Sequence, residues 1–399
     1  MVKPSESNLG SVLNVGIVGH IDHGKTTLLY KLSGKWTDTH SEELKRGITI
    51  KLGYADISIY KDKDGYNILK KGDKIRDVSF IDAPGHEMLM ATMLSGAALI
   101  DAALLVVAAN EGIKPQTREH VMALQAKGIK NLIVIQNKID LVDEEGAKKN
   151  YNSLKEFLKG KYDNALIIPV SAQQDVNIEE IWKALSELPE PDRDKNGDAI
   201  FLVARSFDIN KPGTKPSDLH GAVLGGTLKN GSLKVGDEIE IKPGRLIKEA
   251  NKYRYETIAT KIISLFKGSK KVEELTPGGS MSIETGLDMT LAKGDALAGN
   301  VAGIKGKLPP LTQSLKLKYT LFPEVFGLNV KIKVEPLKPS ELLMLSVNTS
   351  TTGGNIGSLK GDEFEVALKV PTVAFKGENV GIARNIQGHW RLVGYGKII

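Results

Sequence analysis

A chain of 399 residues is longer than one hydrophobic core usually organises, so its length predicts two or three domains. With 41% hydrophobic and 26% charged residues, and no apolar run near the roughly 20 residues of a membrane helix, the composition is that of a globular protein rather than a membrane-spanning one. The absence of cysteine excludes disulfides and thiolate metal sites, and with a polar N-terminus it leads us to expect a cytoplasmic protein without a membrane partner.

The first half of the chain alternates short apolar runs with helical patterns, which predicts a mostly parallel sheet with helices on both faces. The expected strands are Leu13–Val18, Asp77–Ile81, Ala103–Ala108, Leu132–Gln136 and Ala165–Val170. The expected helices are Lys25–Leu32, Met88–Gly96, Thr117–Ala126, Lys148–Leu158 and Ile178–Leu188. Between the first two strands, the insert at residues 57–77 contains Asp64-Gly65, which predicts a β-hairpin.

The turn between the first strand and the first helix matches the phosphate-binding P-loop, G-x-x-x-x-G-K-[ST]. Glycine at Gly19 and Gly24 lets the backbone curl until its N–H groups face the phosphates of a nucleotide. Lys25 is expected to neutralise charge on the β- and γ-phosphates, and the Thr26 hydroxyl to bind Mg²⁺. The nucleotide-binding residues that this turn supplies are therefore Gly19, Asp22, His23, Gly24, Lys25, Thr26 and Thr27.

Two further segments are placed to respond to the γ-phosphate. Asp82 ends a predicted strand, so we expect it to hold Mg²⁺ through water, and Gly85 to offer its N–H to the γ-phosphate. His86 follows and is expected to orient the attacking water, although an ordinary loop histidine is the alternative. Thr49, in Arg46-Gly47-Ile48-Thr49-Ile50, is expected to bind the γ-phosphate and Mg²⁺, although by itself it reads as a strand residue. The catalytic set would be Lys25, Thr49 and His86.

The choice of base is predicted by Asn137-Lys138-Ile139-Asp140 and by Ser171-Ala172. The carboxylate of Asp140 can accept hydrogen bonds from guanine N1–H and N2–H, which adenine does not present. Lys138 would cover the face of the base, Asn137 would tie this loop to the P-loop, and the backbone N–H groups of Ser171 and Ala172 would meet guanine O6. These segments follow the P-loop in the order that a P-loop GTPase domain needs, so they predict GTP or GDP rather than ATP.

Residues 189–198 are rich in proline and charged residues, which predicts a linker, and the sequence pattern changes after them. Short β-type runs between Gly, Pro and Asn turns then predict two all-β barrels, with a break near Leu308-Pro309-Pro310. They include Phe201–Arg205, Glu238–Ile241, Ser314–Tyr319, Leu342–Val347 and Glu363–Val370. The expected domains are thus 1–198, 199–309 and 310–399.

Charge is distributed unevenly between the halves. Residues 199–399 hold 28 Lys+Arg and 19 Asp+Glu, a net +9, whereas residues 1–198 hold 26 and 29, a net −3. A basic second half favours an anionic partner such as nucleic acid, and a solvated basic surface explains the charge equally well.

Longer strings around these motifs resemble one protein family. The P-loop and the strings Arg46–Ile50 and Asp82–Glu87 resemble the elongation-factor-Tu class of translational GTPases. The strings Ser41–Ala55, Met90–Ala98, Arg205–Thr214 and Gly388–Gly396 are similar to the gamma subunits of archaeal and eukaryotic translation initiation factor 2. This resemblance covers nearly the whole chain.

The resemblance implies a GTP-binding domain followed by two β-barrels, working with the alpha and beta subunits of the same factor. It implies a GTPase switch that binds methionylated initiator tRNA, delivers it to the small ribosomal subunit and releases it after hydrolysis, which a GTPase-activating factor stimulates. By position, Asp22 would add a water-mediated contact to Mg²⁺. Two alternatives stay open: an elongation-type factor for another aminoacyl-tRNA, and the GTPase regulatory subunit of a sulfate adenylyltransferase.

The chain departs from the family in one place. Many members carry a four-cysteine zinc knuckle in the insert before the Asp82 strand, and residues 57–77 contain no cysteine here. The few histidines elsewhere cannot replace four ligands, so we expect no zinc.

Overall fold

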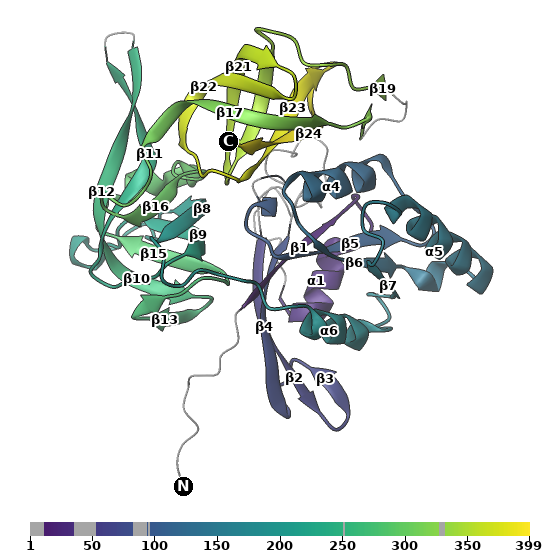
Figure 1. The fold of residues 1–399 in the computed structure, drawn as a ribbon. Coiled ribbons are helices and arrows are strands. Elements are labelled where there is room, and N and C mark those ends of the chain that lie inside the picture. Colours follow the sequence, from purple (N-terminus) through teal and green to yellow (C-terminus); the bar gives the residue numbers. More distant parts are fainter. Residues whose placement is uncertain (1–11, 36–52, 83–93, 95, 250–251, 327–331) are drawn as a thin grey trace. The chain divides into compact units, whose positions relative to one another are not determined.

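The computed structural model describes residues 12–35, 53–82, 94, 96–249, 252–326 and 332–399 (Figure 1). The chain divides into two compact units. The first comprises Met1–Met93, Ile100–Gln125 and Ile129–Asp192, and the second comprises Leu94–Leu99, Ala126–Gly128 and Arg193–Ile399. Among the described helices, none combines the length and apolar character needed to cross a membrane.

The first unit is built on a seven-stranded sheet in the order β3-β2-β4-β1-β5-β6-β7. Its strands are β1 (Leu13–Gly19), β2 (Gly53–Asp62), β3 (Gly65–Asn67), β4 (Asp73–Asp82), β5 (Ala102–Ala108), β6 (Asn131–Asn137) and β7 (Leu166–Pro169). The strands from β4 to β7 run parallel, while β2 and β3 extend the sheet antiparallel. Strands β1 and β5 are buried along their whole length, as expected where helices cover both faces.

Four helices of the first unit are described: α1 (Lys25–Ser33), α4 (Pro115–Ala126), α5 (Glu144–Leu158) and α6 (Ile178–Glu187). Helices α1 and α6 share one apolar core with β1 and β4, which includes Ile17, Leu28, Phe80 and Ile181. Figure 1 shows α4 and α5 on the opposite side of the sheet. The mostly parallel sheet with two helical layers is the predicted arrangement.

Helix α5 begins at Glu144, four residues before the predicted start at Lys148. Its N-cap is Asp143, whose carboxylate accepts a hydrogen bond from Gly146 N at 2.8 Å. This cap satisfies a donor that the first turn leaves without an intrahelical partner, so it extends the helix through a polar, glycine-containing turn. The predicted helix Met88–Gly96 lies outside the described residues except for Leu94 and Gly96.

The insert before the Asp82 strand forms the predicted hairpin. Strands β2 and β3 pair with Asp62 opposite Gly65, so Lys63 and Asp64 form the turn. The hairpin is fastened to α6, because Glu179 Oε1 accepts the Tyr66 N–H at 2.9 Å. The cysteine-free insert is therefore held by hydrogen bonds to a neighbouring helix.

The second unit contains two closed six-stranded barrels, which confirms the predicted fold class. The first has the order β11-β16-β8-β9-β15-β12, and β12 closes it by pairing with β11. Its strands are β8 (Ile200–Phe207), β9 (Val223–Asn230), β11 (Glu238–Glu249), β12 (Lys252–Lys267), β15 (Met281–Thr285) and β16 (Val301–Ile304). The short strands β10 (Leu233–Lys234), β13 (Lys270–Val272) and β14 (Glu274–Leu275) lie beside it. Phe201, Ile239 and Ile283 are fully buried in its core.

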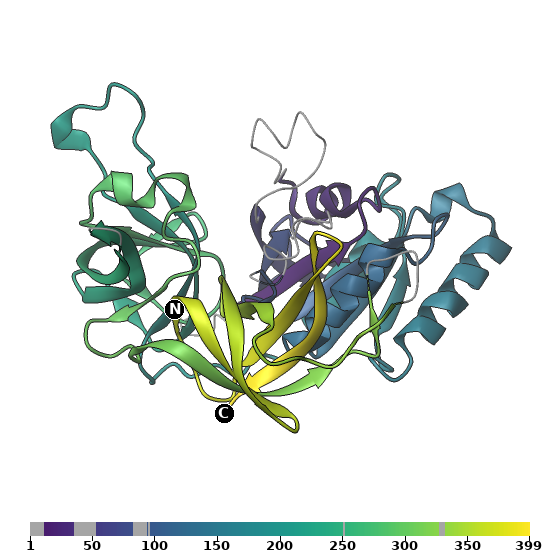
Figure 2. The ribbon, with the colours of Figure 1, turned by 90° about the horizontal axis from the view of Figure 1, so that it is seen from above.

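The second barrel has the order β17-β22-β21-β20-β23-β24 and closes where β24 pairs with β17. Its strands are β17 (Leu311–Leu321), β20 (Leu342–Val347), β21 (Ser350–Lys360), β22 (Glu363–Val373), β23 (Asn379–Ile386) and β24 (His389–Ile398). They run from green to yellow in Figure 2. A small pair, β18 (Glu324–Val325) and β19 (Ile332–Lys333), lies outside this order. The boundaries 198/199 and 309/310 between domains stay predictions.

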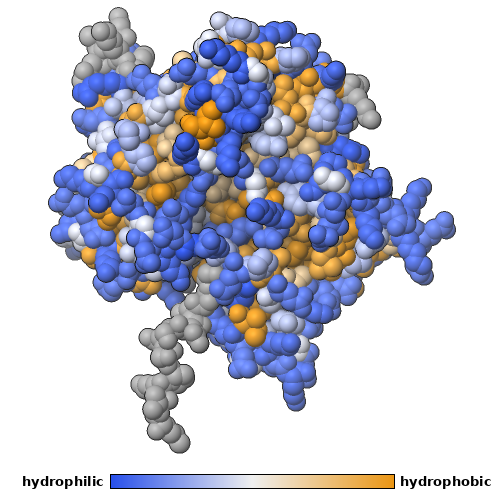
Figure 3. All heavy atoms as spheres, viewed as in Figure 1, coloured by the Kyte–Doolittle hydropathy of each residue, from blue (hydrophilic) through white to orange (hydrophobic). Residues whose placement is uncertain are grey.

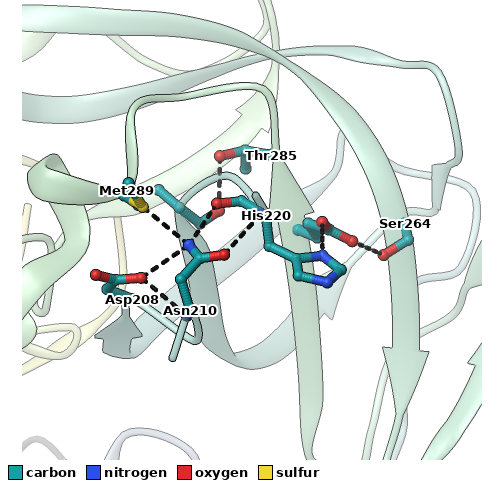
Figure 4. Close-up of polar contacts among 8 residues, drawn as sticks. Asp208, Asn210, His220, Ser264, Thr285 and Met289 are labelled. Carbon is teal, nitrogen blue, oxygen red and sulfur yellow. Dashed lines mark hydrogen bonds and ion pairs between the residues drawn. The ribbon is translucent and has the colours of Figure 1, made fainter. Parts of the chain in front are cut away.

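The long connection between β8 and β9 is closed at its base by Asn210 (Figure 4). The Asn210 Nδ2 group donates to the His220 carbonyl oxygen, and the His220 N–H donates back to Asn210 Oδ1, both at 2.8 Å. Asp208 Oδ1 accepts the Asn210 N–H at 3.0 Å, and Glu284 Oε1 lies 2.7 Å from His220 Nδ1. These contacts fix both ends of an exposed loop that spans residues 211–219 and contains the short 3-10 helix η3 (Pro216–Asp218).

Hydrophilic residues cover most of the face drawn in Figure 3. The large apolar side chains that are exposed come from several separate elements, as with Leu69 at 68%, Leu141 at 58% and Leu246 at 52%. Single exposed apolar side chains of this kind are ordinary on a protein surface.

Candidate nucleotide-binding site

The predicted site residues gather at the carboxyl edge of the parallel sheet in the first unit. Strand β1 pairs with β4 so that Ile17 lies opposite Asp82, and β5 pairs with β6 so that Ala108 lies opposite Asn137. The P-loop therefore leaves the sheet along the same edge as Asp82 and Asn137. Ligands of open α/β sheets bind at this edge, outside the carboxyl ends of the strands.

The P-loop adopts a backbone that requires glycine at both of its glycine positions. Gly19 has φ +141° and Gly24 has φ +89°, values that L side chains rarely adopt. A Cβ on Gly19 would lie 2.3 Å from the Val106 carbonyl oxygen, and one on Gly24 would lie 2.4 Å from Asn137 Nδ2. Substituting either glycine would thus push the loop away from β5 or from the Asn137 side chain.

Lys25 begins α1 directly after the P-loop. Its side chain is buried, and Nζ donates to the His20 carbonyl oxygen at 2.7 Å. Thr26 and Thr27 are half-buried in the first turn of α1, and Asp22 is exposed with φ 61°. A lysine beside the N-terminus of a helix creates positive potential that suits a phosphate group.

Asp82 is fully buried at the end of β4. Gly85 and His86, which follow it, and Thr49, upstream of β2, lie outside the described residues. Of the residues predicted to respond to the γ-phosphate, the structure therefore places Asp82 alone.

Asn137 joins three segments of the predicted site. Its Nδ2 group donates to the His23 carbonyl oxygen at 2.9 Å, and its Oδ1 accepts the Ala172 N–H at 3.0 Å. The predicted link between Asn137 and the P-loop is therefore confirmed. Lys138 follows with φ 59° and leads into the 3-10 helix η2 (Ile139–Leu141), on which Asp140 is exposed.

The backbone N–H groups of Ser171 and Ala172 bind within the protein. The Ser171 N–H donates to the Val176 carbonyl oxygen at 3.3 Å, and the Ala172 N–H donates to Asn137 as described above. These two bonds shape the loop after β7. That the same N–H groups meet guanine O6 stays a prediction, and it requires both Ser171 and Ala172 to exchange or share their acceptors.

Glu111 was not predicted to belong to the site. It follows β5, and its carboxylate lies 3.4 Å from Lys114 Nζ and 3.9 Å from Lys138 Nζ. The same carboxylate lies 3.9 Å from Nε2 of His23, a buried ring whose pKa burial and the neighbouring charge of His20 lower to about 4. Glu111 comes just after a strand, at the carboxyl edge of the sheet, and this position is the sequence signal that could have indicated its place in the site.

His120 was also missed. It lies on α4 and accepts the Gly19 N–H through Nδ1 at 2.9 Å. A histidine among the apolar residues of a helix that packs on the sheet is a weak signal, because most such residues are only structural.

Comparisons with known proteins agree with this geometry. The elongation factor Tu GTP-binding domain model matches residues 10–191, and the model of the initiation factor eIF2 gamma C-terminal region matches residues 313–398. The chain is 51% identical to translation initiation factor 2 subunit gamma of Methanococcus maripaludis strain S2, with 98% of each chain covered. It is 52% identical to the protein of the same name from Pyrococcus horikoshii, with 97% of each covered.

A solved structure of a bacterial selenocysteine-specific elongation factor is also similar, with a TM-score of 0.76 and 25% sequence identity. The match covers 96% of this chain and 58% of that longer one. The chain thus shares its fold with that elongation factor over nearly its whole length.

Proposed function

This chain belongs to the translation initiation factor 2 gamma-subunit family, and we propose that it is the GTP-dependent switch that carries methionylated initiator tRNA to the small ribosomal subunit and releases it after GTP hydrolysis. As a member of this family it is a translational GTPase that binds guanine nucleotides. The observation that carries the proposal furthest is Asn137, whose side chain joins the P-loop to the loop expected to select the base.

In this proposal, the N–H groups of the curled P-loop and Lys25 hold the phosphates, while Asp140 and Lys138 hold the guanine. The curled backbone between Gly19 and Gly24 and the lysine at the start of α1 support phosphate binding. Bound phosphate oxygens would replace the His20 carbonyl oxygen as the acceptor of the Lys25 ammonium group.

Mg²⁺ fits the donors at the phosphate end of the site. The buried Asp82 carboxylate and the half-buried Thr26 hydroxyl are oxygen donors of the kind that Mg²⁺ prefers. We assign Thr26 and Thr49 as direct ligands, with Asp82 and Asp22 acting through water. When bound, the ion would neutralise charge that develops on the phosphate oxygens.

His86 would orient the attacking water, with Thr49 and Lys25 positioned around the γ-phosphate. Gly85 would offer its N–H to that phosphate, so loss of the phosphate would release the segment after Asp82. A switch of this design hydrolyses GTP slowly until an activating factor completes the positioning.

The proposed partners are the alpha and beta subunits of the same factor, initiator tRNA and the small ribosomal subunit. The net charge of +9 on residues 199–399 supports a polyanionic partner for the barrels. We retain 1–198, 199–309 and 310–399 as the domain boundaries. No zinc is part of the proposal, and one tightly bound zinc per purified chain, measured by metal analysis, would overturn that part.

Filter binding tests the switch directly. Methionylated initiator tRNA should bind more tightly in the presence of a non-hydrolysable GTP analogue than with GDP, with and without the alpha subunit. Equal affinity in both states would contradict the proposal, because a ligand without differential affinity shifts no equilibrium. Equal binding of elongator or selenocysteinyl tRNA would indicate an elongation-type factor. GTP binding without any tRNA binding would favour a regulatory subunit of a metabolic enzyme.

A further inference from the structure

One hydrogen bond joins α4 to the first residue of the P-loop. The backbone N–H of Gly19 donates to Nδ1 of His120 at 2.9 Å, across 101 residues of sequence. The His120 side chain is only 2% exposed. This bond is thus shielded from water. If its acceptor were removed, the buried Gly19 N–H would have no water molecule to bind instead, so the loss would cost more stability than at an exposed site.

The His120 ring is suited to accept this bond permanently. Burial lowers its pKa to about 3, with the charges of Lys25 and His20 as further causes. The ring is therefore neutral at physiological pH, and an Nδ1 that accepts a hydrogen bond requires the proton on Nε2. A charged ring would have no acceptor nitrogen to offer.

Gly19 is the point at which the chain leaves the sheet. It is the last residue of β1 and still pairs with Val106 of β5, yet its φ of +141° already turns the backbone into the loop. The direction of the Gly19 N–H fixes the orientation of the peptide plane that starts this turn. An acceptor held rigidly by α4 therefore sets the direction in which the following N–H groups point.

The P-loop is fixed at a second point by Asn137, which binds the His23 carbonyl oxygen at 2.9 Å. Between these two points lie three residues, His20 to Asp22. If either contact is lost, the curled segment between them is no longer held at one of its two ends.

We propose that His120 is a positioning residue for nucleotide binding, which acts through Gly19 by holding the start of the P-loop in the conformation that faces the phosphates. The inference rests on the nucleotide site assigned above, and it is tested by nucleotide release without any tRNA. A negative tRNA experiment would therefore not contradict the proposed role of His120. Conversely, a negative result for His120 would not contradict tRNA delivery.

Two isosteric substitutions separate acceptor position from simple packing. His120→Asn can place its amide oxygen near the position of Nδ1, whereas His120→Gln places its amide oxygen near that of Nε2. In stopped-flow measurements on the full chain, a fluorescent GDP analogue should leave His120→Gln about tenfold faster than wild type, the effect of losing one buried hydrogen bond. The His120→Asn protein should release it within about twofold of the wild-type rate.

Melting temperatures of the two variants provide the structural control. Variants of similar stability with different release rates would support the proposal, because both carry a polar amide in the same buried position. Equal release rates from the Asn and Gln variants would overturn it.

The wild-type protein offers a test that needs no substitution. The ring ¹⁵N chemical shifts of His120 should report a neutral Nε2–H tautomer that does not titrate between about pH 5 and 8, in keeping with its lowered pKa. The Gly19 amide should exchange slowly with solvent. An Nδ1–H tautomer or a rapidly exchanging Gly19 amide would overturn the proposal even if the variants did not fold.

Discussion

The side-chain amide of Asn137 donates to the carbonyl oxygen of His23 at 2.9 Å, so the loop that follows β6 and the loop that follows β1 share one side chain. The same side chain accepts the Ala172 N–H at 3.0 Å. Replacing it therefore loosens the phosphate and base ends of the site together.

Asn137→Ala should weaken GDP and GTP binding by a similar factor of about a hundred, because two buried hydrogen bonds are lost and both nucleotides use the same loops. Equilibrium titration with fluorescent analogues measures this. Asn131→Ala is the matched control, since Asn131 lies at the other end of β6 and its amide makes only a long contact of 3.5 Å to Asp101. An Asn137→Ala protein with wild-type affinity would remove this side chain from the site.

Asp140→Asn should change the base preference of the site from guanine to xanthine. The carboxylate can accept two hydrogen bonds from guanine, whereas an amide presents one acceptor and donors that match the second oxygen of xanthine. Competition between GDP and xanthosine diphosphate measures the change, which we expect to exceed about a hundredfold in relative affinity. Asp143→Asn is the control, because asparagine caps a helix as well as aspartate does and α5 should be kept. Retained preference for GDP would argue against Asp140 as the reader of the base.

His86→Ala should lower stimulated GTP hydrolysis by orders of magnitude and leave GTP affinity unchanged. The expected cause is a misplaced attacking water, since the remaining ligands of the phosphates are untouched. Single-turnover phosphate release on the ribosomal subunit, beside a separate binding titration, distinguishes the two effects. Unchanged turnover would remove His86 from the mechanism.

Acid should destabilise the folded first unit through two buried histidines. Burial lowers the pKa of His120 to about 3 and that of His23 to about 4, from an ordinary 6.5. Between each lowered pKa and 6.5, the ring is protonated in the unfolded chain and neutral in the folded chain. The free energy of unfolding therefore falls as the pH falls below 6.5. Above 6.5 both states are neutral at these rings, and the dependence ends.

Between its lowered pKa and the ordinary value, each of these rings should change the free energy of unfolding by about 1.4 kcal/mol per pH unit. Denaturant unfolding at several pH values measures the slope. The slope should decrease by about one histidine's share in His120→Asn and stay at the wild-type value in the exposed control His389→Asn. Identical slopes in wild type and His120→Asn would contradict the burial of a neutral ring.

Asn210→Ala should open the base of the loop between β8 and β9. Its side chain exchanges two hydrogen bonds with the His220 backbone, and their loss should cost the first barrel about 1–3 kcal/mol. Chymotrypsin should then cut faster after Leu219, an exposed residue of the loop. Ser217→Ala, on the exposed part of the same loop, should leave the cleavage rate unchanged. Equal cleavage of both variants would show that the loop is held by other contacts.

Much of the first unit could be predicted because its signals are local. The continuous apolar runs of β1 and β5 and the glycines of the P-loop depend on neighbours within a few residues. The early start of α5 was missed although Asp143 is a clear N-cap residue, since the apolar pattern of that helix begins one turn later. Closure of the barrels was predicted as a class, but the pairings of β11 with β16 and of β24 with β17 depend on how strands far apart in the sequence meet.

The contact between His120 and Gly19 could not be predicted from either segment alone. Each is explained locally, as a helix residue and as a P-loop glycine, and their meeting depends on how α4 lies against the end of β1. The same holds for Glu111, whose neighbours Lys138 and His23 come from two other segments.

Closure of the two barrels also affects whether strands of different copies of this chain can pair during folding or heating. Within each closed order, β11-β16-β8-β9-β15-β12 and β17-β22-β21-β20-β23-β24, every described strand pairs with a strand on either side over part of its length. Beyond Lys242, however, the described partner of β11 is β12 alone. The sheet of the first unit instead ends at β3 and β7, which are three and four residues long, and β7 ends in Pro169. The closed parts of the barrels and the short, proline-terminated β7 are therefore poor templates for another chain, whereas the arm of β11 and β12 beyond Lys242 lacks this protection.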